Sequence, residues 1–229
     1  MIKMYVEPHY VRAMTAFDLD KSAINDPMLR EMVEYAQVKV NHDIGTKIWL
    51  EPVVGIDNYR ENKVDGSNKD YYVRNSWRWY LGDLNDDGEL TIADVEVWLY
   101  DTANETRSLA TVSTIDERGK ITLSTAPSST YDLKITYIKC PVSIETPHYL
   151  VKKATAELAA AMAYSGVQAR EYKRIAMPGL SVSVTPKASL MYKEKYESTI
   201  TQILSRMPIR LDKPTDASLL TPLEFVGNY

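Results

Sequence analysis

The chain of 229 residues is 45% apolar and 25% charged, with a formal net charge of −4. These values are ordinary for a soluble globular protein of one or two domains, and the length suffices to bury a core without disulfide or metal staples. The negative balance argues against general nucleic-acid binding by the whole chain, and the single cysteine, Cys140, excludes an internal disulfide framework.

The sequence also bears on the compartment. No apolar run approaches the roughly 20 residues that span a bilayer. The first eight residues lack the basic region and apolar core of a signal peptide. We therefore expect a protein that is not secreted, does not enter a membrane and stays in a reducing interior.

Residues 1–24 are expected to be an extended N-terminal segment, followed by a helix over about 26–45. Asn25-Asp26-Pro27 supplies a capping side chain and then proline in the first helical turn. Gly45 is placed to end the helix. Between them, apolar residues recur at helical spacing and predict one buried face: Met28, Leu29, Met32, Val33, Ala36, Val40 and Ile44.

A β-rich insertion is expected over about 70–138, after a stretch from 46 in which no pattern dominates. Residues 95–100 and 133–138 alternate apolar and polar side chains, as half-buried strands do. Residues 116–120 have the composition of a hairpin turn in which Gly119 adopts a positive φ, with 121–124 as the return strand. We expect a small antiparallel sheet, extended by 71–73 and 77–81, with Trp77 and Trp79 as a buried aromatic pair.

Two more helices are expected at about 147–166 and 188–207. Thr146-Pro147 repeats the start signal of cap and proline, and the apolar stripe of this helix ends near Gly166. Pro208 ends the last helix. The sequence therefore predicts an α+β fold, in which a small bundle of three main helices with an inserted antiparallel β-sheet forms one domain over 25–207.

Residues 208–229 are expected to form an extended C-terminal arm. A disordered tail is normally poor in large apolar residues, whereas this one keeps five, which we predict to dock on a neighbouring chain: Leu219, Leu220, Leu223, Phe225 and Val226. The alternative is that the arm wraps back onto its own domain.

The charges are distributed unevenly along the chain. Residues 57–101 contain eleven acidic and five basic side chains, and residues 168–213 contain nine basic and four acidic ones. Surfaces of opposite sign favour head-to-tail association of copies, which gives rings when the rotation closes. The alternative is two solvated surfaces that never meet.

One acidic stretch has the spacing of a calcium loop. Calcium prefers six to eight hard oxygen ligands, and oxygens fall at the required positions in residues 83–94, with Gly88 at the sharp turn and Leu90 as the apolar anchor. The loop resembles the dockerin variant of the EF-hand, and its candidate ligands are Asp83, Asn85, Asp87, Glu89, Thr91 and Asp94. The alternative is a hairpin turn rich in Asp, Asn and Gly that binds no metal.

No catalytic motif is present in the sequence. His9, His42 and His148 are far apart and have no metal-ligand or base–nucleophile spacing. A glycine-rich phosphate loop, a Gly-x-Ser-x-Gly elbow and a Cys-x-x-Cys pair are also missing. We therefore expect a protein that is not an enzyme.

The order of parts along the chain is distinctive: a helix with Ala36 and Val40 in its core, a β insertion that ends in 119–123 and 135–137, an Ala-rich helix from Pro147, and the piece 179–183 before a last helix. This order, over roughly 20–207, resembles the head–tail connector (adaptor) proteins of long-tailed bacteriophages and related viruses. The acidic loop and the long tail depart from the family pattern.

The resemblance implies a structural virion protein at the head–tail junction, assembled in the host cytoplasm. Copies of the chain, commonly twelve, would form a ring beneath the portal protein and offer a docking surface to a stopper or tail-completion protein. Genomic DNA would pass through the ring without sequence-specific binding, which suits a negatively charged channel wall. In this family the C-terminal segment often engages the portal.

Three other classes are weighed against this reading. A calcium-dependent, dockerin-like protein-binding module would use the loop at 83–94, but dockerins are secreted and have two such loops. Another tail or neck assembly protein would share the overall features. An enzyme with dispersed residues would reveal itself as a deep pocket of convergent polar groups.

Overall fold

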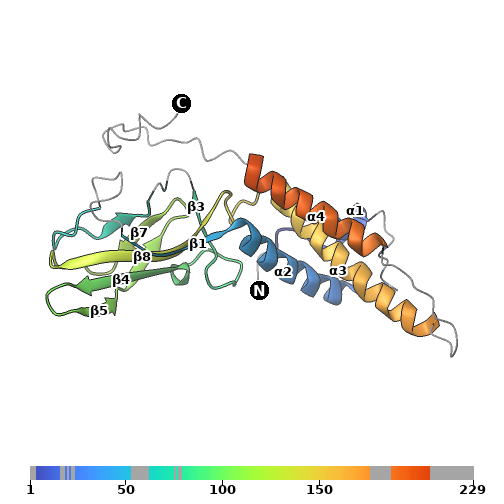
Figure 1. Ribbon diagram of the computed structural model, residues 1–229, viewed down its shortest axis with the longest axis horizontal. Coiled ribbons are helices and arrows are strands. Elements are labelled where there is room, and N and C mark those ends of the chain that lie inside the picture. The colour runs from blue at the N-terminus through green and yellow to red at the C-terminus, as the bar shows by residue number, and fades with distance from the viewer. Residues whose placement is uncertain are drawn as a thin grey trace. The chain divides into compact units, whose positions relative to one another are not determined.

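The structure, a computed structural model, describes residues 4–15, 19, 21, 24–52, 62–74, 76, 79–175 and 187–206, with residues 168–175 and 206 described by their backbone alone. These residues form two compact units, a helical unit from 4–44 and 147–206 and a β unit from 45–146 (Figure 1). The α+β class is as predicted. The single domain expected over 25–207 divides in two because the insertion has a core of its own.

The helical unit contains α1 (Pro8–Met14), α2 (Asp26–Ile44), α3 (Tyr149–Ile175) and α4 (Lys187–Arg206). Its centre is α3, which packs against the other three helices. The apolar face predicted on α2 is buried in the structure. Its residues Leu29, Val33, Ala36 and Val40 are all fully buried. Small side chains along α3 allow this close packing, and those buried in the core are Ala156, Ala159, Ala160, Ala161 and Ala163. Among the described residues, no helix is long and apolar enough to cross a membrane.

The prediction that residues 1–24 are extended is wrong, because Pro8–Met14 form α1. Pro8 occupies the first turn, where its missing N–H costs nothing and its fixed φ favours the helix. Val11 is fully buried in the core of the helical unit. A helix of seven residues is marginal alone, so it is the packing of Val11 that holds this turn.

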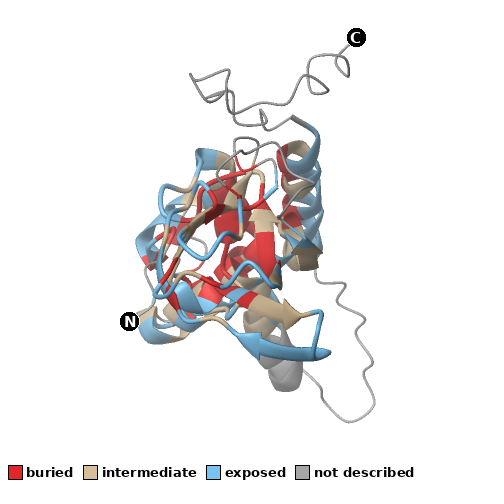
Figure 2. Ribbon diagram, turned by 90° about the vertical axis from the view of Figure 1, so that its left-hand side faces the viewer, coloured by how far each residue is buried: buried red, intermediate tan, exposed pale blue. Residues whose placement is uncertain are grey.

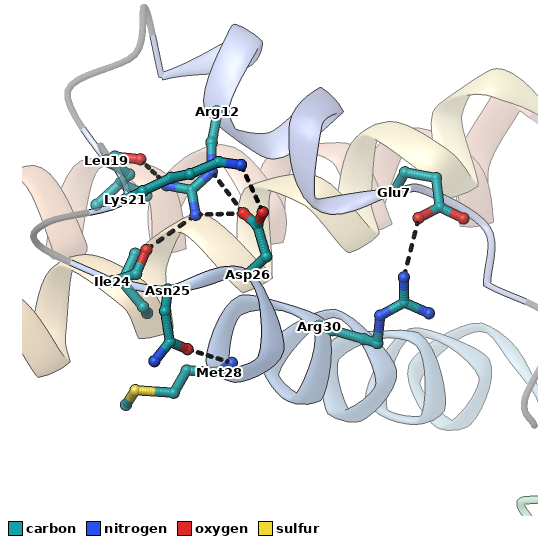
Figure 3. Close-up of polar contacts among 9 residues, drawn as sticks. All are labelled: Glu7, Arg12, Leu19, Lys21, Ile24, Asn25, Asp26, Met28 and Arg30. Carbon is teal, nitrogen blue, oxygen red and sulfur yellow. Dashed lines mark hydrogen bonds and ion pairs between the residues drawn. The ribbon is translucent and has the colours of Figure 1, made fainter.

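A buried arginine ties the segment after α1 to the start of α2 (Figure 3). The side chain of Arg12 is only 7% exposed. It donates to the backbone oxygen of Leu19, to that of Ile24 at 2.8 Å and to Oδ1 of Asp26 at 2.8 Å. Lys21 lies 2.8 Å from the other oxygen of Asp26. These contacts, from Lys21 first and then Arg12, lower the pKa of Asp26.

The ends of α2 and α4 fall close to their predicted positions, whereas α3 runs beyond its predicted end. The side chain of Asn25 caps α2 by accepting a hydrogen bond from the N–H of Met28 at 2.9 Å. The helix α3 begins at Tyr149 and continues past Gly166 to Ile175. A glycine inside a helix costs about 1 kcal/mol, and the stripe continues beyond it because Val167 packs against the core.

The β unit consists of two antiparallel sheets. The first has the order β1 (Thr46–Pro52), β8 (Tyr131–Cys140), β4 (Val95–Asp101), β5 (Thr106–Leu109), and β3 (Tyr80–Gly82) also pairs with β8. The second has the order β2 (Asp70–Tyr72), β7 (Lys120–Leu123), β6 (Val112–Ile115). A short 3-10 helix, η1 (Ile92–Asp94), precedes β4.

One core fills the β unit, and both sheets contribute to it. Alternate residues of β8 enter it, as strand geometry requires, and Leu133, Ile135 and Tyr137 are at most 3% exposed. From the smaller sheet come Tyr71 and Ile121, both fully buried. Figure 2 colours the ribbon by burial, with buried residues in red. The alternation predicted for 95–100 and 133–138 is therefore that of real strands.

The hairpin turn predicted at 116–120 is confirmed and joins β6 to β7. Gly119 has φ +88°. The N–H of Asp116 donates to the backbone oxygen of Lys120 at 2.9 Å, and the backbone oxygen of Asp116 accepts from the N–H of Gly119 at 2.9 Å. A side chain on Gly119 would begin 2.5 Å from Cγ2 of Val73. Both the conformation and the space therefore require glycine here.

The insertion is larger than the predicted 70–138, because strands begin at Thr46 and end at Cys140. The strand β1 was missed: a bulge between Ile48 and Glu51 interrupts it, and Leu50 has φ +47°. Within the described residues, the strand expected at 77–81 begins at Tyr80 and runs to Gly82. Trp77 lies outside the described residues, so its pairing with Trp79 stays a prediction.

Candidate functional site

The predicted calcium loop, residues 83–94, connects β3 to β4 and is shaped by its own side chains. The side-chain oxygen of Asn85 accepts a hydrogen bond from the N–H of Asp87 at 3.1 Å, and Asp87 accepts one from the N–H of Glu89 at 2.9 Å. Gly88 has φ +81° and Asp86 has φ +62°. These are turns in which Asx side chains replace backbone acceptors.

The carboxylate of Asp94 holds the two ends of this loop together. It is fully buried, and its Oδ1 accepts hydrogen bonds from the N–H groups of Leu84 at 2.7 Å and Asn85 at 3.3 Å. Its Oδ2 accepts from the N–H of Thr91 at 2.6 Å. The hydroxyl of Thr91 in turn accepts from the N–H of Ala93, which completes a capping box at η1.

Asp83 is the second buried carboxylate of the loop, at 2% exposure. Its two oxygens accept hydrogen bonds from the N–H groups of Asp87 at 3.2 Å and Gly88 at 2.7 Å. The pKa of Asp83 is raised to about 6, mainly because burial disfavours the charged carboxylate. The hydrogen bond from the N–H of Gly88 lowers this pKa, and the negative charges of Asp94 and Asp87 raise it further.

As it stands, the loop does not fit a calcium site, and we derive no role for calcium from it. The two buried carboxylates serve backbone N–H groups, and the other three polar ligands of the acidic turn are exposed. Within the described ranges, no group of three or more His, Cys, Asp or Glu side chains is placed to hold a metal ion. The structure thus brings Asp83, Thr91 and Asp94 together as loop supports, while Asn85, Asp87 and Glu89 lie at the surface.

The other predicted site residues fall outside the part that the structure describes. These are the apolar residues of the C-terminal arm, whose docking stays a prediction: Leu219, Leu220, Leu223, Phe225 and Val226. The histidines are described. His9 and His42 are exposed on α1 and α2, and His148 is exposed just before α3.

The helical unit contains a groove that the sequence did not predict. It has a volume of about 720 Å³ and lies between α1, α3 and α4. Its walls are mainly amphipathic, with Tyr10 and Met14 from α1 and Met191 and Tyr192 from α4. The ammonium group of Lys195 lies 4.7 Å from the centre of the Tyr192 ring. The other lining residues are polar or charged, so the groove combines an apolar side with a charged one: Lys153, Glu157, Glu194, Lys195, Ser198, Thr199 and Gln202.

A buried carboxylate lies in this groove. Glu157 of α3 is 2% exposed. Its Oε2 accepts a hydrogen bond of 2.7 Å from the hydroxyl of Thr199 on α4, which is itself buried. Its Oε1 lies 3.7 Å from Nζ of Lys153, an ion pair too long for a hydrogen bond. One oxygen of a desolvated carboxylate thus retains its capacity to accept a strong hydrogen bond.

A signal for this pair was present in the sequence. Glu157 falls on the apolar stripe of α3, three residues after Ala154, and Thr199 falls on the stripe of α4, three residues after Tyr196. A polar residue within an apolar stripe is buried by the same packing that buries its neighbours, so it needs a partner. A search for polar residues within the apolar stripes of α3 and α4 would therefore have identified Glu157 and Thr199 as buried.

Comparison of the chain with protein-family models, with curated proteins and with solved structures finds no match in any of the three.

Proposed function

We propose that the chain is a structural virion protein, a head–tail connector that forms a ring between the portal and the tail or stopper. The observation that supports this most is the order of parts. The helix α2 leads directly into an inserted β unit, which returns to α3 and α4, so that one helical unit is assembled from both sides of the insertion. This is the order on which the resemblance to connector proteins rests.

The charges suit association between copies of the chain. The acidic stretch 57–101 belongs to the β unit, whereas the described part of the basic stretch 168–213 belongs to the helical unit. Two units of opposite charge can make a heterologous contact, in which the β unit of one copy meets the helical unit of the next. Copies joined in this way close into a ring.

The remaining parts of the proposal follow from the resemblance. The portal protein lies on one side of the ring and a stopper or tail-completion protein on the other, and the apolar C-terminal arm contacts one of them. DNA passes through the centre, where acidic side chains prevent adhesion to phosphate. The protein has no catalytic role.

Native mass spectrometry of the purified chain tests the ring. We expect a closed oligomer at low salt, alone or after addition of the portal ring, and its loss as salt screens the charges. Reversing two exposed lysines of α4, Lys187→Glu and Lys193→Glu, should weaken the oligomer. A compensating change in the acidic loop, Asp86→Lys with Asp87→Lys, should restore it in part. A chain that stays monomeric at all salt concentrations and ignores the portal ring would refute the proposal.

A further inference from the structure

The buried carboxylate of Glu157 in the groove of the helical unit is only partly satisfied by its neighbours. Glu157 is desolvated, and burying a carboxylate is costly unless its oxygens are hydrogen-bonded or paired. Thr199 satisfies Oε2, while Oε1 has only the ammonium group of Lys153 at 3.7 Å. A guanidinium would serve this oxygen better than the lysine does, because its fixed fork of N–H donors matches carboxylate geometry.

The side chains that line the groove indicate what kind of segment would carry such a cation. Met14 and Met191 offer flexible apolar surface, and Tyr10 offers an exposed aromatic ring. An arginine flanked by aliphatic residues matches both the carboxylate of Glu157 at the floor of the groove and the apolar side chains of its walls. The exposed Lys195 on the rim opposes a second cation only weakly, because solvent screens its charge.

The chain itself supplies such a segment immediately after α4. Ile209, Arg210 and Leu211 follow the end of α4 at Arg206, and Lys213 comes two residues later. Thr199 lies seven residues before Arg206, which is about 10 Å along the helix axis. The four residues from 207 to 210 span up to roughly 14 Å when extended. The segment can therefore reach the floor of the groove of its own chain, and equally that of a neighbouring copy.

We propose that the groove between α1, α3 and α4 is the docking site for residues 209–213 of this chain, with the guanidinium of Arg210 bound to the carboxylate of Glu157. The aliphatic side chains of Ile209 and Leu211 then cover Met14, Met191 and Tyr10 on the walls. This docking leaves the apolar residues from Leu219 onward available for another partner. It does not depend on the connector function.

Disulfide trapping in the full-length chain tests the proposal. The only native cysteine, Cys140, is fully buried in the β unit and does not interfere. Gln202 lines the groove and is half-buried, so Gln202→Cys places a thiol at its wall. Leu211→Cys places the second thiol in the segment. We expect rapid disulfide formation under mild oxidation, detected by mass spectrometry of tryptic fragments.

Two further variants identify the contact that holds the segment. Arg210→Gln or Glu157→Gln should lower the effective concentration of the two thiols about tenfold, as expected for loss of a charged hydrogen bond. Glu194→Gln, an exposed carboxylate on the rim of the same groove, is the matched control and should have no effect. Because Arg210 follows the last residue of α4 in the sequence and is not among the described residues that form the helical core, its substitution keeps the test valid even where Glu157→Gln impairs folding.

Mixing a Gln202→Cys chain with a Leu211→Cys chain separates docking within a chain from docking between copies. A disulfide within the doubly substituted monomer, or one between the two mixed chains, supports the site. No disulfide in either experiment, or disulfides formed at equal rates with Arg210 and with Gln at 210, would overturn it. Since the ring is assayed separately by mass, failure here leaves the proposed connector function standing, and the reverse also holds.

Discussion

Replacing the buried arginine of α1 tests how the N-terminal segment is held. In Arg12→Met, an apolar side chain of similar length keeps most of the packing but removes every donor. The backbone oxygens of Leu19 and Ile24, both buried, then lose their hydrogen bonds. A buried acceptor left without a partner costs about 1–3 kcal/mol. For two such oxygens with partial relaxation, we expect a loss of about 2–4 kcal/mol in the free energy of unfolding.

The matched control is another arginine in the same region (Figure 3). The side chain of Arg30 is 43% exposed and lies 3.7 Å from Glu7, which is 52% exposed. An exposed ion pair contributes at most about 1 kcal/mol, so Arg30→Met should change little. The same substitution at two arginines therefore isolates the effect of burial.

Urea unfolding followed by circular dichroism at 222 nm measures both variants, because this signal arises mainly from the helical unit. Tryptophan fluorescence serves as an internal reference, since all four tryptophans lie within the β unit. We expect the helical midpoint of Arg12→Met to fall, with an unchanged slope. Equal losses in the two variants would refute the reasoning, because burial would then have no effect on the energy of the contact.

Three further predictions concern the β unit. Ile135→Ala removes a fully buried side chain from strand β8 and should lower the free energy of unfolding by about 2–5 kcal/mol. Asp132→Ala, at an exposed position of the same strand, should lower it little. Urea unfolding followed by tryptophan fluorescence compares the two variants. The side-chain carboxyl of Asp83 should titrate in the folded protein near pH 6 in carbon-detected NMR. Because its pKa is raised on folding, Asp83 favours the folded state below about pH 4 and loses this contribution as the pH rises through 6; a midpoint near 4 would contradict the burial argument. Calcium at millimolar concentration should leave the melting temperature unchanged, since the loop carboxylates serve N–H groups, and a calcium-dependent rise would restore the calcium site as a prediction.

The long elements were predictable because one periodicity dominates each of them. The stripe of α2 has a clear cap at Asn25, and β8 alternates from Asp132 to Ile135 before a run of buried residues at 135–138. A regular spacing of apolar residues shows which face of a helix or strand is buried, and it can be recognised without knowledge of the rest of the fold. The turn at Gly119 was equally clear, because only a residue that tolerates positive φ suits it.

The remaining elements depend on contacts that are distant in the sequence. The short helix α1 is stabilised by burial of Val11, which no local pattern reveals. The strand β1 is an edge strand whose residues are all exposed or half-buried, so it has no clean alternation. In the acidic loop, the spacing of the oxygens was read correctly, but whether they face a metal or the backbone depends on where Asp94 folds back.

The pairing of β1 with β8 has an architectural consequence. Thr46, two residues after α2, lies opposite Lys139, and β8 ends at Cys140, seven residues before Pro147. The points at which the chain enters and leaves the β unit are therefore adjacent strands of one sheet. Because Thr46 and Lys139 are paired, the inserted strands can be lengthened or exchanged without moving the points at which the sheet connects to the helices. Diversification of the inserted surface is thereby separated from the integrity of the bundle that presents it.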